Sequence, residues 1–400
     1  MQKKLIALAV ASLASGAALA QTNVTVYGIA DAGYVYSSGS AGKDAFQNGD
    51  KIGGNNTFSG IQSGLLSGSR IGFKGEEALG NGLKAVFTLE YSLGIDGNGG
   101  IGSGTGSTLN SRQQFVGLQS DKLGTVALGR QYAPGYQATV NNDPFAGAAF
   151  SPTTFLTTNA ANTINPGSLA RWNNAATYTS PNWSGFTAKA NYSFGERPVD
   201  GMFNSKDTST TDNGMFGIGG NYSNGPLNID LVYQTRQKVY GSYGSVPAFG
   251  ANFSGTGDGK DINEYYIGGS YDFKVVKVMG SWQQQNDKNP LTNTTYGNLD
   301  NTIWTVGAVV PVMAASNILF SYGNLGWDMG RQPDGEKLLN NNSQSAALGW
   351  TTAMSKRTTL YAGYVWTSND NYSSASGPAA GVGAVNEDNN TFLAGVRHTF

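Results

Sequence analysis

The sequence predicts an all-β fold, a single antiparallel transmembrane barrel of 16 strands, from three observations. After residue 20 no apolar run is long enough for a membrane helix, and many segments alternate apolar and polar residues. The connections between these segments are short and long in turn. The last segment, 389–400, alternates up to an aromatic terminus. Because an open sheet edge in hydrocarbon leaves backbone groups unsatisfied, this segment is expected to pair with the first strand and close the barrel.

The composition agrees with a surface that excludes charge. Charged residues make up 13% of the chain and aromatic residues 11%, whereas a soluble domain carries about 25% charged residues. The lipid face of a barrel has this character, and its polar face lies inside. The chain has no cysteine, which excludes disulfides and thiolate metal sites.

The amino-terminal segment has the pattern of a secretory signal. Lys3 and Lys4 precede an apolar stretch, 5–13, and the small residues at 18–20 form a cleavage site. We expect residues 1–20 to be removed and residues 21–400 to form one barrel domain. The remaining 23 basic and 26 acidic residues give a net charge of −3. Such a balance gives no indication of a nucleic-acid partner.

The candidate strands have the two-residue period of a wall between two solvents. In 185–194, every second residue is Phe, Ala or Tyr, and the residues between them are Thr, Lys, Asn and Ser. A soluble β-sandwich with one solvated face would show the same alternation. The predicted strands are 22–36, 68–78, 83–93, 110–120, 124–132, 171–180, 185–194, 214–223, 227–236, 262–272, 276–285, 301–311, 317–326, 343–354, 358–367 and 389–400.

The connections favour the membrane barrel, because seven short and eight long ones alternate strictly. This asymmetry is typical of bacterial outer-membrane barrels, which have short periplasmic turns and long outer loops. The short connections are 79–82, 121–123, 181–184, 224–226, 273–275, 312–316 and 355–357. The long connections are 37–67, 94–109, 133–170, 195–213, 237–261, 286–300, 327–342 and 368–388.

Six motifs in order resemble the general trimeric porins of Gram-negative bacteria, most closely the beta-proteobacterial type. The resemblance implies a homotrimer in the outer membrane and passive diffusion of ions and small hydrophilic solutes through a water-filled channel. A substrate-selective channel for sugars or organic anions, and a soluble secreted β-protein or adhesin, remain as alternatives. The motifs are VTVYGIADAG (24–33), SRIGFKGEEALGNG (69–82), RQQFVGL (112–118), GTVALGRQY (124–132), RWNNAATYTSP (171–181) and GVRHTF (395–400).

The same resemblance implies that the third long connection, 133–170, folds inward and narrows the pore. It contains one acid, Asp143, and no base. By matched motif, Arg70, Arg112 and Arg171 form the arginine ladder that faces such an acid in the family. Each arginine could instead be a solvated charge at the end of a loop. For Arg112 the strand parity is unfavourable, since Val116 and Leu118 would share its face.

Opposed charges across a water-filled constriction produce a transverse field. With one loop acid against three arginines, we expect a weak preference for anions. Glu90 and Lys84 are also expected to line the wall of the pore, together with Lys74 and Glu76.

Arg130 differs from the other arginines because Val126 and Leu128 share its face, which points it out of the barrel. It is therefore a candidate for a contact between subunits, or alternatively a residue that braces the third loop. The small outward residues of the first strand, Gly28 and Ala30, would also suit close packing of subunits.

The remaining expectations concern partners and catalysis. The resemblance implies contact with outer-membrane lipid and lipopolysaccharide. It also implies recognition of the carboxy-terminal strand, which ends in Phe400, by the barrel-assembly machinery. The single histidine, His398, lies on the lipid-side register and is a poor general base. We expect no enzymatic activity and no cofactor.

Overall fold

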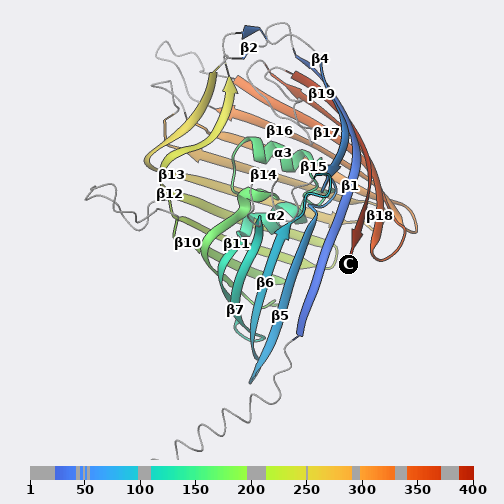
Figure 1. The fold of residues 1–400 in the computed structure, drawn as a ribbon. Helices are drawn as coiled ribbons and strands as arrows, with labels where there is room; N and C mark the ends of the chain where they lie inside the picture. The colour runs from blue at the N-terminus through green and yellow to red at the C-terminus, as the bar shows by residue number, and fades with distance from the viewer. Residues whose placement is uncertain are drawn as a thin grey trace, which may run out of the picture.

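The computed structural model describes residues 23–41, 46–47, 50–51, 55–97, 110–195, 213–248, 251–290, 298–328, 340–370 and 387–400. The predicted signal segment 1–20 lies outside the described residues. The described strands form a closed antiparallel barrel with 16 spanning strands, β1 and β5 to β19, as the sequence predicts (Figure 1). Closure occurs where β1 (Asn23–Ala41) pairs with β19 (Glu387–Thr399).

Between these two strands, the wall follows the order of the chain. Its strands are β5 (Arg70–Gly80), β6 (Leu83–Ser92), β7 (Ser111–Ser120), β8 (Gly124–Tyr132), β9 (Arg171–Thr179), β10 (Phe186–Ser193), β11 (Met215–Asn224), β12 (Leu227–Ala248), β13 (Ala251–Asp272), β14 (Lys277–Asp287), β15 (Asn301–Met313), β16 (Ser316–Asp328), β17 (Asn340–Ala353) and β18 (Thr358–Asn369).

The first strand is longer than the sequence predicts, because β1 continues into the expected outer loop 37–67. Its first half pairs with β5, and its second half, Ala32–Ser40, pairs with β4 (Asn55–Ser63). The segment β4 thus continues the wall above β5 without spanning it. A small separate hairpin consists of β2 (Phe46–Gln47) and β3 (Asp50–Lys51).

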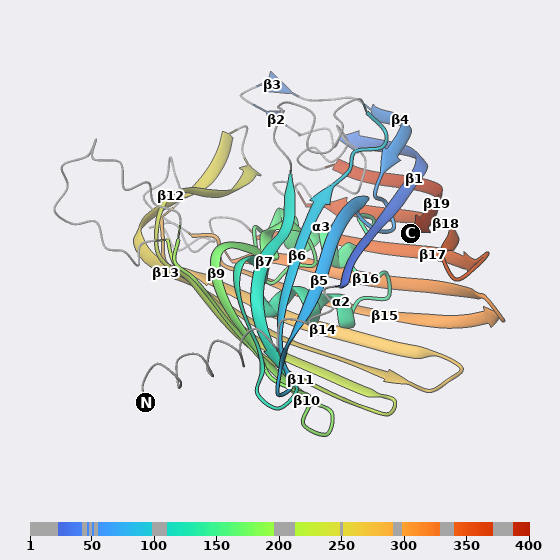
Figure 2. The same ribbon diagram turned by 60° about the horizontal axis from the view of Figure 1, so that its bottom comes forward.

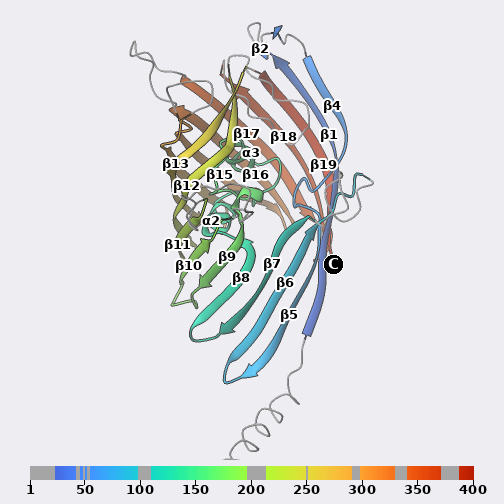
Figure 3. The same ribbon diagram turned by 60° about the vertical axis from the view of Figure 1, so that its left-hand side comes forward.

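A second difference concerns the expected outer loop 237–261. Here β12 and β13 extend as one long hairpin, with paired residues up to Ala248 and Ala251. This extension rises beyond the neighbouring strands, because β11 pairs only with the first part of β12 (Figure 3). Its glycine-rich and serine-rich sequence predicts a loop, but backbone pairing does not require apolar side chains.

The seven short connections are tight turns on one rim of the barrel. In the turn between β5 and β6, Asn81 and Gly82 have φ values of 52° and 75°. A two-residue hairpin requires positive φ at both positions, and Asn followed by Gly is the favoured pair. The local sequence therefore fixes the register of this hairpin.

The outer face of the wall is apolar and open to its surroundings. Val116, Leu128 and Leu231 are 59%, 57% and 55% exposed, although they lie in the middle of paired strands. Exposed aliphatic side chains at every second position of a strand are typical of a wall that faces lipid. None of the helices among the described residues is both long and apolar enough to cross a membrane.

The third long connection folds inward, as the sequence predicts. It contains α2 (Pro134–Asn141), α3 (Pro152–Asn159) and the short 3-10 helix η1 (Ser168–Ala170), and the strands surround both α-helices (Figure 2). Both α-helices begin with proline, which suits the first helical position because its missing N–H needs no partner there. The helix α2 contacts β10 to β13, and α3 contacts β15 to β17.

An apolar cluster lies inside the barrel, where the third loop packs against β15 to β19 and β1. Leu156 and Phe150 of the loop are buried against inward residues such as Leu325 and Val365. The inward faces on this side are therefore less polar than the sequence predicts. The loop covers these apolar residues, so the polar wall of β1 and β5 to β9 remains as the lining of the lumen.

Candidate pore constriction

The centre of the polar wall is the carboxylate of Glu90 on β6. Arg112 donates from Nε to Glu90 Oε1 at 2.8 Å, and an Arg70 nitrogen lies 3.8 Å from the same oxygen. The hydroxyl of Tyr27 donates to Glu90 Oε2 at 3.0 Å. Glu90 is only 4% exposed. A buried carboxylate is tolerated because these partners satisfy both of its oxygens.

A β-bulge explains how Arg112 reaches this cluster. Its strand pairs Glu90 with Gln113 but Tyr91 with Ser111, so Arg112 is the extra residue of the bulge. A bulge re-aims the side chain of the strand that carries it. Arg112 therefore turns inward, whereas Val116, farther along β7, stays 59% exposed on the outer face. The parity argument from the sequence could not include this irregularity.

Gly68, just before β5, allows the two arginines to approach each other. Its carbonyl accepts the Arg70 Nε–H at 2.8 Å. A Cβ at this position would lie 3.0 Å from an Arg112 guanidinium nitrogen, so a side chain would force that group away. The close approach of two like charges is offset by the shared carboxylate of Glu90.

Tyr132, at the end of β8, extends the cluster to Arg171. Its hydroxyl accepts an Arg112 N–H at 3.2 Å, and the Arg171 guanidinium lies 5.3 Å from the centre of its ring. The ring of Tyr136 on α2 stacks on Tyr132 with centroids 3.6 Å apart. The structure thus brings Arg70, Arg112 and Arg171 together where the third loop leaves the wall. Tyr132 is the last residue of the motif GTVALGRQY, but it is not among the predicted site residues.

Asp143 lies elsewhere than the sequence predicts. It is 2% exposed, and its carboxylate accepts the backbone N–H groups of Phe145 at 3.1 Å and Gly147 at 2.9 Å. An aspartate before a turn commonly bonds the backbone two residues on. Asp143 therefore stabilises the fold of the third loop and does not face the arginines.

Two more carboxylates of the inner wall accept hydrogen bonds from loops. Glu264 on β13 accepts the N–H groups of Thr163 and Ile164, and Asp31 on β1 accepts those of Leu66 and Ser67. Both carboxylates are nearly fully buried. These acids anchor inward segments, and Glu264 also forms an ion pair with Arg236 at 3.2 Å. Glu264 was not among the predicted pore residues.

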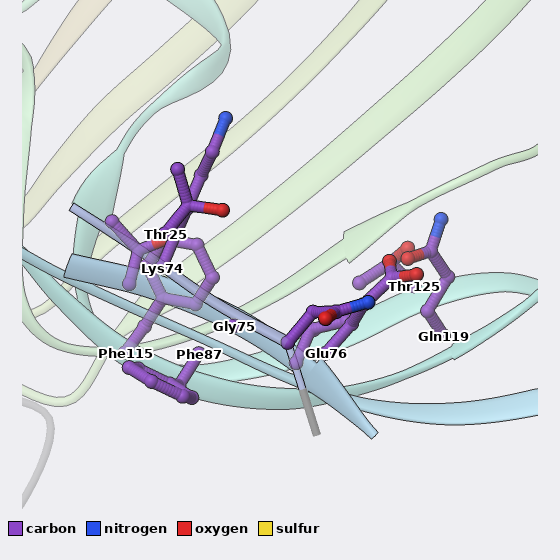
Figure 4. A pocket seen from close by; sticks show the side chains of 11 residues that line it. Thr25, Lys74, Gly75, Glu76, Phe87, Phe115, Gln119 and Thr125 are labelled. Atoms are coloured by element: carbon purple, nitrogen blue, oxygen red, sulfur yellow. The ribbon is translucent and has the colours of Figure 1, made fainter. Parts of the chain in front are cut away.

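Lys84 lies near the short-turn rim, away from the arginine cluster. Its ammonium is 3.2 Å from Glu76 Oε1, and both groups are partly exposed. Glu76 belongs to a groove of about 530 Å³ on the inner wall, which Lys74, Gln119 and Thr125 also line (Figure 4). Val86, Phe87 and Phe115 also line this groove, which therefore has a mixed polar and apolar surface between the arginine cluster and the short-turn rim.

Arg130 is half-buried and lies where the pairing of β8 with β9 is irregular. Its guanidinium donates to the carbonyl oxygens of Ser111 and Arg171, both at 3.1 Å, and to Oδ1 of Asn173. Ser111 directly precedes Arg112. Arg130 therefore binds the backbone beside two of the clustered arginines.

Gly28 and Ala30 lie on the outer face of β1. Gly28 is covered by the ring of Phe400 from the same chain, so its small size has a reason within the protomer. Ala30 is opposite His398, whose Nδ1 is 2.9 Å from the hydroxyl oxygen of Thr358. The first and the last strand of the chain therefore both contribute to this outer surface.

A closed barrel with an apolar outer face and a polar inner wall carrying ionised groups defines a transmembrane diffusion channel. The model of one protein family, described as Gram-negative porin, matches residues 7–372. The chain belongs to this family, and its location is the outer membrane.

Individual relatives agree over the full length. Outer membrane porin protein 32 of Delftia acidovorans is 30% identical over 407 residues, which cover 100% of both chains. An outer membrane porin protein of Bordetella pertussis is 32% identical, and the match covers 96% of this chain and 99% of the relative. Among solved structures, the anion-selective porin from Comamonas acidovorans has a TM-score of 0.70 and 26% identity. That match covers 95% of this chain and 100% of the porin chain.

Proposed function

We propose that the protein is a general diffusion porin with a weak preference for anions. The observation that carries this proposal is the charge of the constriction. The described cluster contains three guanidinium groups, on Arg70, Arg112 and Arg171, and one carboxylate, on Glu90. The acid of the constriction is therefore Glu90, which lies among the arginines on the wall, and not Asp143 on the loop opposite them.

The physical basis is the sign of the field at the narrow part of the lumen. A cluster with excess positive charge in a low-dielectric wall raises the local concentration of anions. Among the other buried acids, Glu264 is offset by Arg236, whose guanidinium lies 3.2 Å from its carboxylate. Asp31 and Asp143 accept hydrogen bonds from loop backbone and not from the clustered arginines. The similarity to the anion-selective porin from Comamonas acidovorans supports the same sign.

We place three further features in the proposal. Residues 1–20 are a cleaved signal, and residues 21–400 form one domain. The protein is a homotrimer in contact with lipid and lipopolysaccharide, with Ala30 and Arg130 on the subunit-facing surface. The terminal strand with Phe400 is the element that the assembly machinery recognises. In this proposal the chain is a channel and not an enzyme, in agreement with the outward position of His398.

The experiment is the reversal potential of purified protein in planar bilayers under a tenfold gradient of potassium chloride. We expect a potential of the sign that chloride permeation produces. Replacing potassium by a bulkier cation should change the potential less than replacing chloride by a bulkier anion. Clear cation selectivity would contradict the proposal.

A further inference from the structure

A niche of about 190 Å³ lies between α2 and the inner wall formed by β9 to β12. None of the clustered arginines lines it, although Lys189 contacts Tyr132 of that cluster. The niche lies toward the short-turn rim, since Asp230 is close to the first residue of β12. Two charged side chains line it, Lys189 on β10 and Asp230 on β12. The question that the niche raises is what these two charges bind.

Lys189 has no acidic partner among the described residues. Its ammonium donates to the backbone carbonyl of Tyr132 at 2.6 Å, and no salt bridge of the described part of the chain includes it. An ammonium has three N–H donors. One is directed to Tyr132, and the remaining two leave capacity for an anionic group in the niche.

Asp230 is a buried carboxylate whose hydrogen-bond donors are all uncharged side-chain amides. It is 3% exposed and accepts hydrogen bonds from the side-chain amides of Asn142, Asn221 and Asn228 at 2.8–2.9 Å, and from Asn141 at 3.3 Å. Amide donors satisfy the oxygens but do not cancel the charge. In the described residues no cation lies within salt-bridge distance of Asp230.

The register keeps the two charges apart. Lys189 is opposite Gly219, which is opposite Val232, whereas Asp230 is opposite Asn221. A Cβ on Gly219 would lie 2.8 Å from Cβ of Pro134, so the start of α2 lies directly over this glycine. An apolar surface formed by Pro134, Gly219 and Val232 therefore lies between the two charged groups of the niche.

We propose that this niche binds a small zwitterion, such as an amino acid with a short aliphatic body. The carboxylate of the solute pairs with Lys189, its ammonium lies beside Asp230, and its methylene groups cover Val232. The proposal goes beyond passive diffusion of ions, and it needs only that solutes enter the lumen. A solute with a single charge can satisfy one end of the niche and leaves the other charge unpaired, which disfavours its binding.

The test uses the full-length protein in planar bilayers and three probes with the same number of carbons, four, namely 4-aminobutyrate, butyrate and butylammonium. Each is added to the short-turn side at the same concentration and ionic strength, and solute-induced current noise gives its dissociation constant. We expect 4-aminobutyrate to bind about tenfold more tightly than either singly charged probe. One additional hydrogen bond between charged groups increases the affinity by about this factor. Equal noise from all three probes would overturn the proposal, and this comparison needs no substitution.

Two substitutions assign the binding to the niche. In Lys189→Gln, 4-aminobutyrate should no longer bind more tightly than butylammonium. In Asp230→Asn, it should no longer bind more tightly than butyrate. The matched controls are Lys277→Gln and Asp272→Asn, which remove one charge of each sign from paired positions at the same rim. These controls should keep the tenfold advantage. Retention of the advantage in both niche variants would overturn the assignment, whereas the conductance without probe tests the diffusion function separately.

Discussion

Gly28 and Phe400 close the barrel by exchanging both backbone hydrogen bonds. The N–H of Gly28 donates to the Phe400 carbonyl at 3.0 Å, and the N–H of Phe400 donates to the Gly28 carbonyl at 3.1 Å. The Phe400 ring occupies the space where a side chain of Gly28 would stand. The last residue of the chain is therefore both a hydrogen-bonded partner of the first strand and a cover for its glycine.

This relationship predicts that Gly28→Ala weakens closure. A Cβ at Gly28 would lie 2.3 Å from Cζ of Phe400 and 2.7 Å from the backbone oxygen of Arg70. The ring can turn away, but the backbone oxygen is fixed by the sheet. Overpacking of this kind costs about 1–3 kcal/mol. We expect a lower unfolding temperature of the heat-resistant barrel on unheated gels.

The control is Gly97→Ala, because a Cβ at Gly97 meets nothing within 4 Å. It should leave the unfolding temperature unchanged. Equal behaviour of the two variants would show that the Phe400 ring does not restrict position 28. Phe400→Ala combined with Gly28→Ala should lose less than the sum of the single changes, since one of the two clashes is then absent.

The second prediction concerns the carboxylate within the arginine cluster. Glu90→Gln keeps the shape of the side chain but removes the only negative charge that bonds Arg112 and Tyr27 in the described cluster. The excess positive charge at the constriction then increases by one. We expect the ratio of chloride to potassium permeability to rise severalfold, measured from reversal potentials in a potassium chloride gradient. The heat stability should fall, since one partner of a buried pair is lost.

Its control is Glu76→Gln, which removes an acid of the same wall. Glu76 is partly exposed and paired with Lys84 near the short-turn rim. Water and salt screen an exposed charge much more than a buried one. A change in permeability ratio as large for Glu76→Gln as for Glu90→Gln would therefore contradict a constriction centred on Glu90.

The sequence predicted the spanning strands and the turns because the two-residue period reports which solvent each side chain meets. It also predicted that the third long connection lies inside, from the resemblance. It could not predict the direction of Arg112, since a single extra residue at a bulge reverses parity. Nor does it show that β12 and β13 continue as paired strands through a glycine-rich and serine-rich stretch.

The role of an acid was the hardest feature to predict. Asp143 and Glu264 differ little in sequence context from acids that line a pore, yet both accept backbone N–H groups of the third loop. The same holds for Asp31, which binds the segment before β5. Whether a carboxylate faces water or caps a loop depends on the path of that loop, which tertiary packing decides.

The third prediction concerns Arg130, whose guanidinium bonds the carbonyl oxygens of Ser111 and Arg171. Removing it leaves these carbonyls without that donor at a place where the strand pairing is irregular. We expect Arg130→Ala to lower the anion preference, because the backbone of Arg112 and Arg171 is then less well positioned. Reversal potentials measure this effect, and unheated gels measure the stability of the trimers.

The two readouts separate the roles considered for Arg130. Loss of trimer stability with an unchanged permeability ratio indicates a subunit contact alone. A changed ratio in stable trimers indicates that Arg130 positions the constriction. Lys277→Ala is the control, because Lys277 begins β14, whose neighbours are β13 and β15 and not β1, β8 or β9, and it should change neither readout. An unchanged ratio and unchanged trimers for Arg130→Ala would contradict both roles.

The last prediction is a pH dependence at the outer rim, where Asp300 precedes β15. Burial raises the pKa of Asp300 to about 6, a hydrogen bond from the Asp287 backbone lowers it, and the nearby charges of Asp287 and Asp328 raise it. Because the folded pKa lies above the ordinary value of 3.8, the fold favours the protonated form. This stabilisation is present below about pH 3.8 and is lost as the pH rises through about 6. The unfolding temperature of the wild type should therefore fall more between pH 4 and pH 7 than that of Asp300→Asn, which cannot ionise there. The control Asp258→Asn alters an exposed aspartate that pairs with Lys260, and its unfolding temperature should change with pH as that of the wild type does. If the unfolding temperature of Asp300→Asn fell between pH 4 and pH 7 as much as that of the wild type, Asp300 would not be the group that titrates.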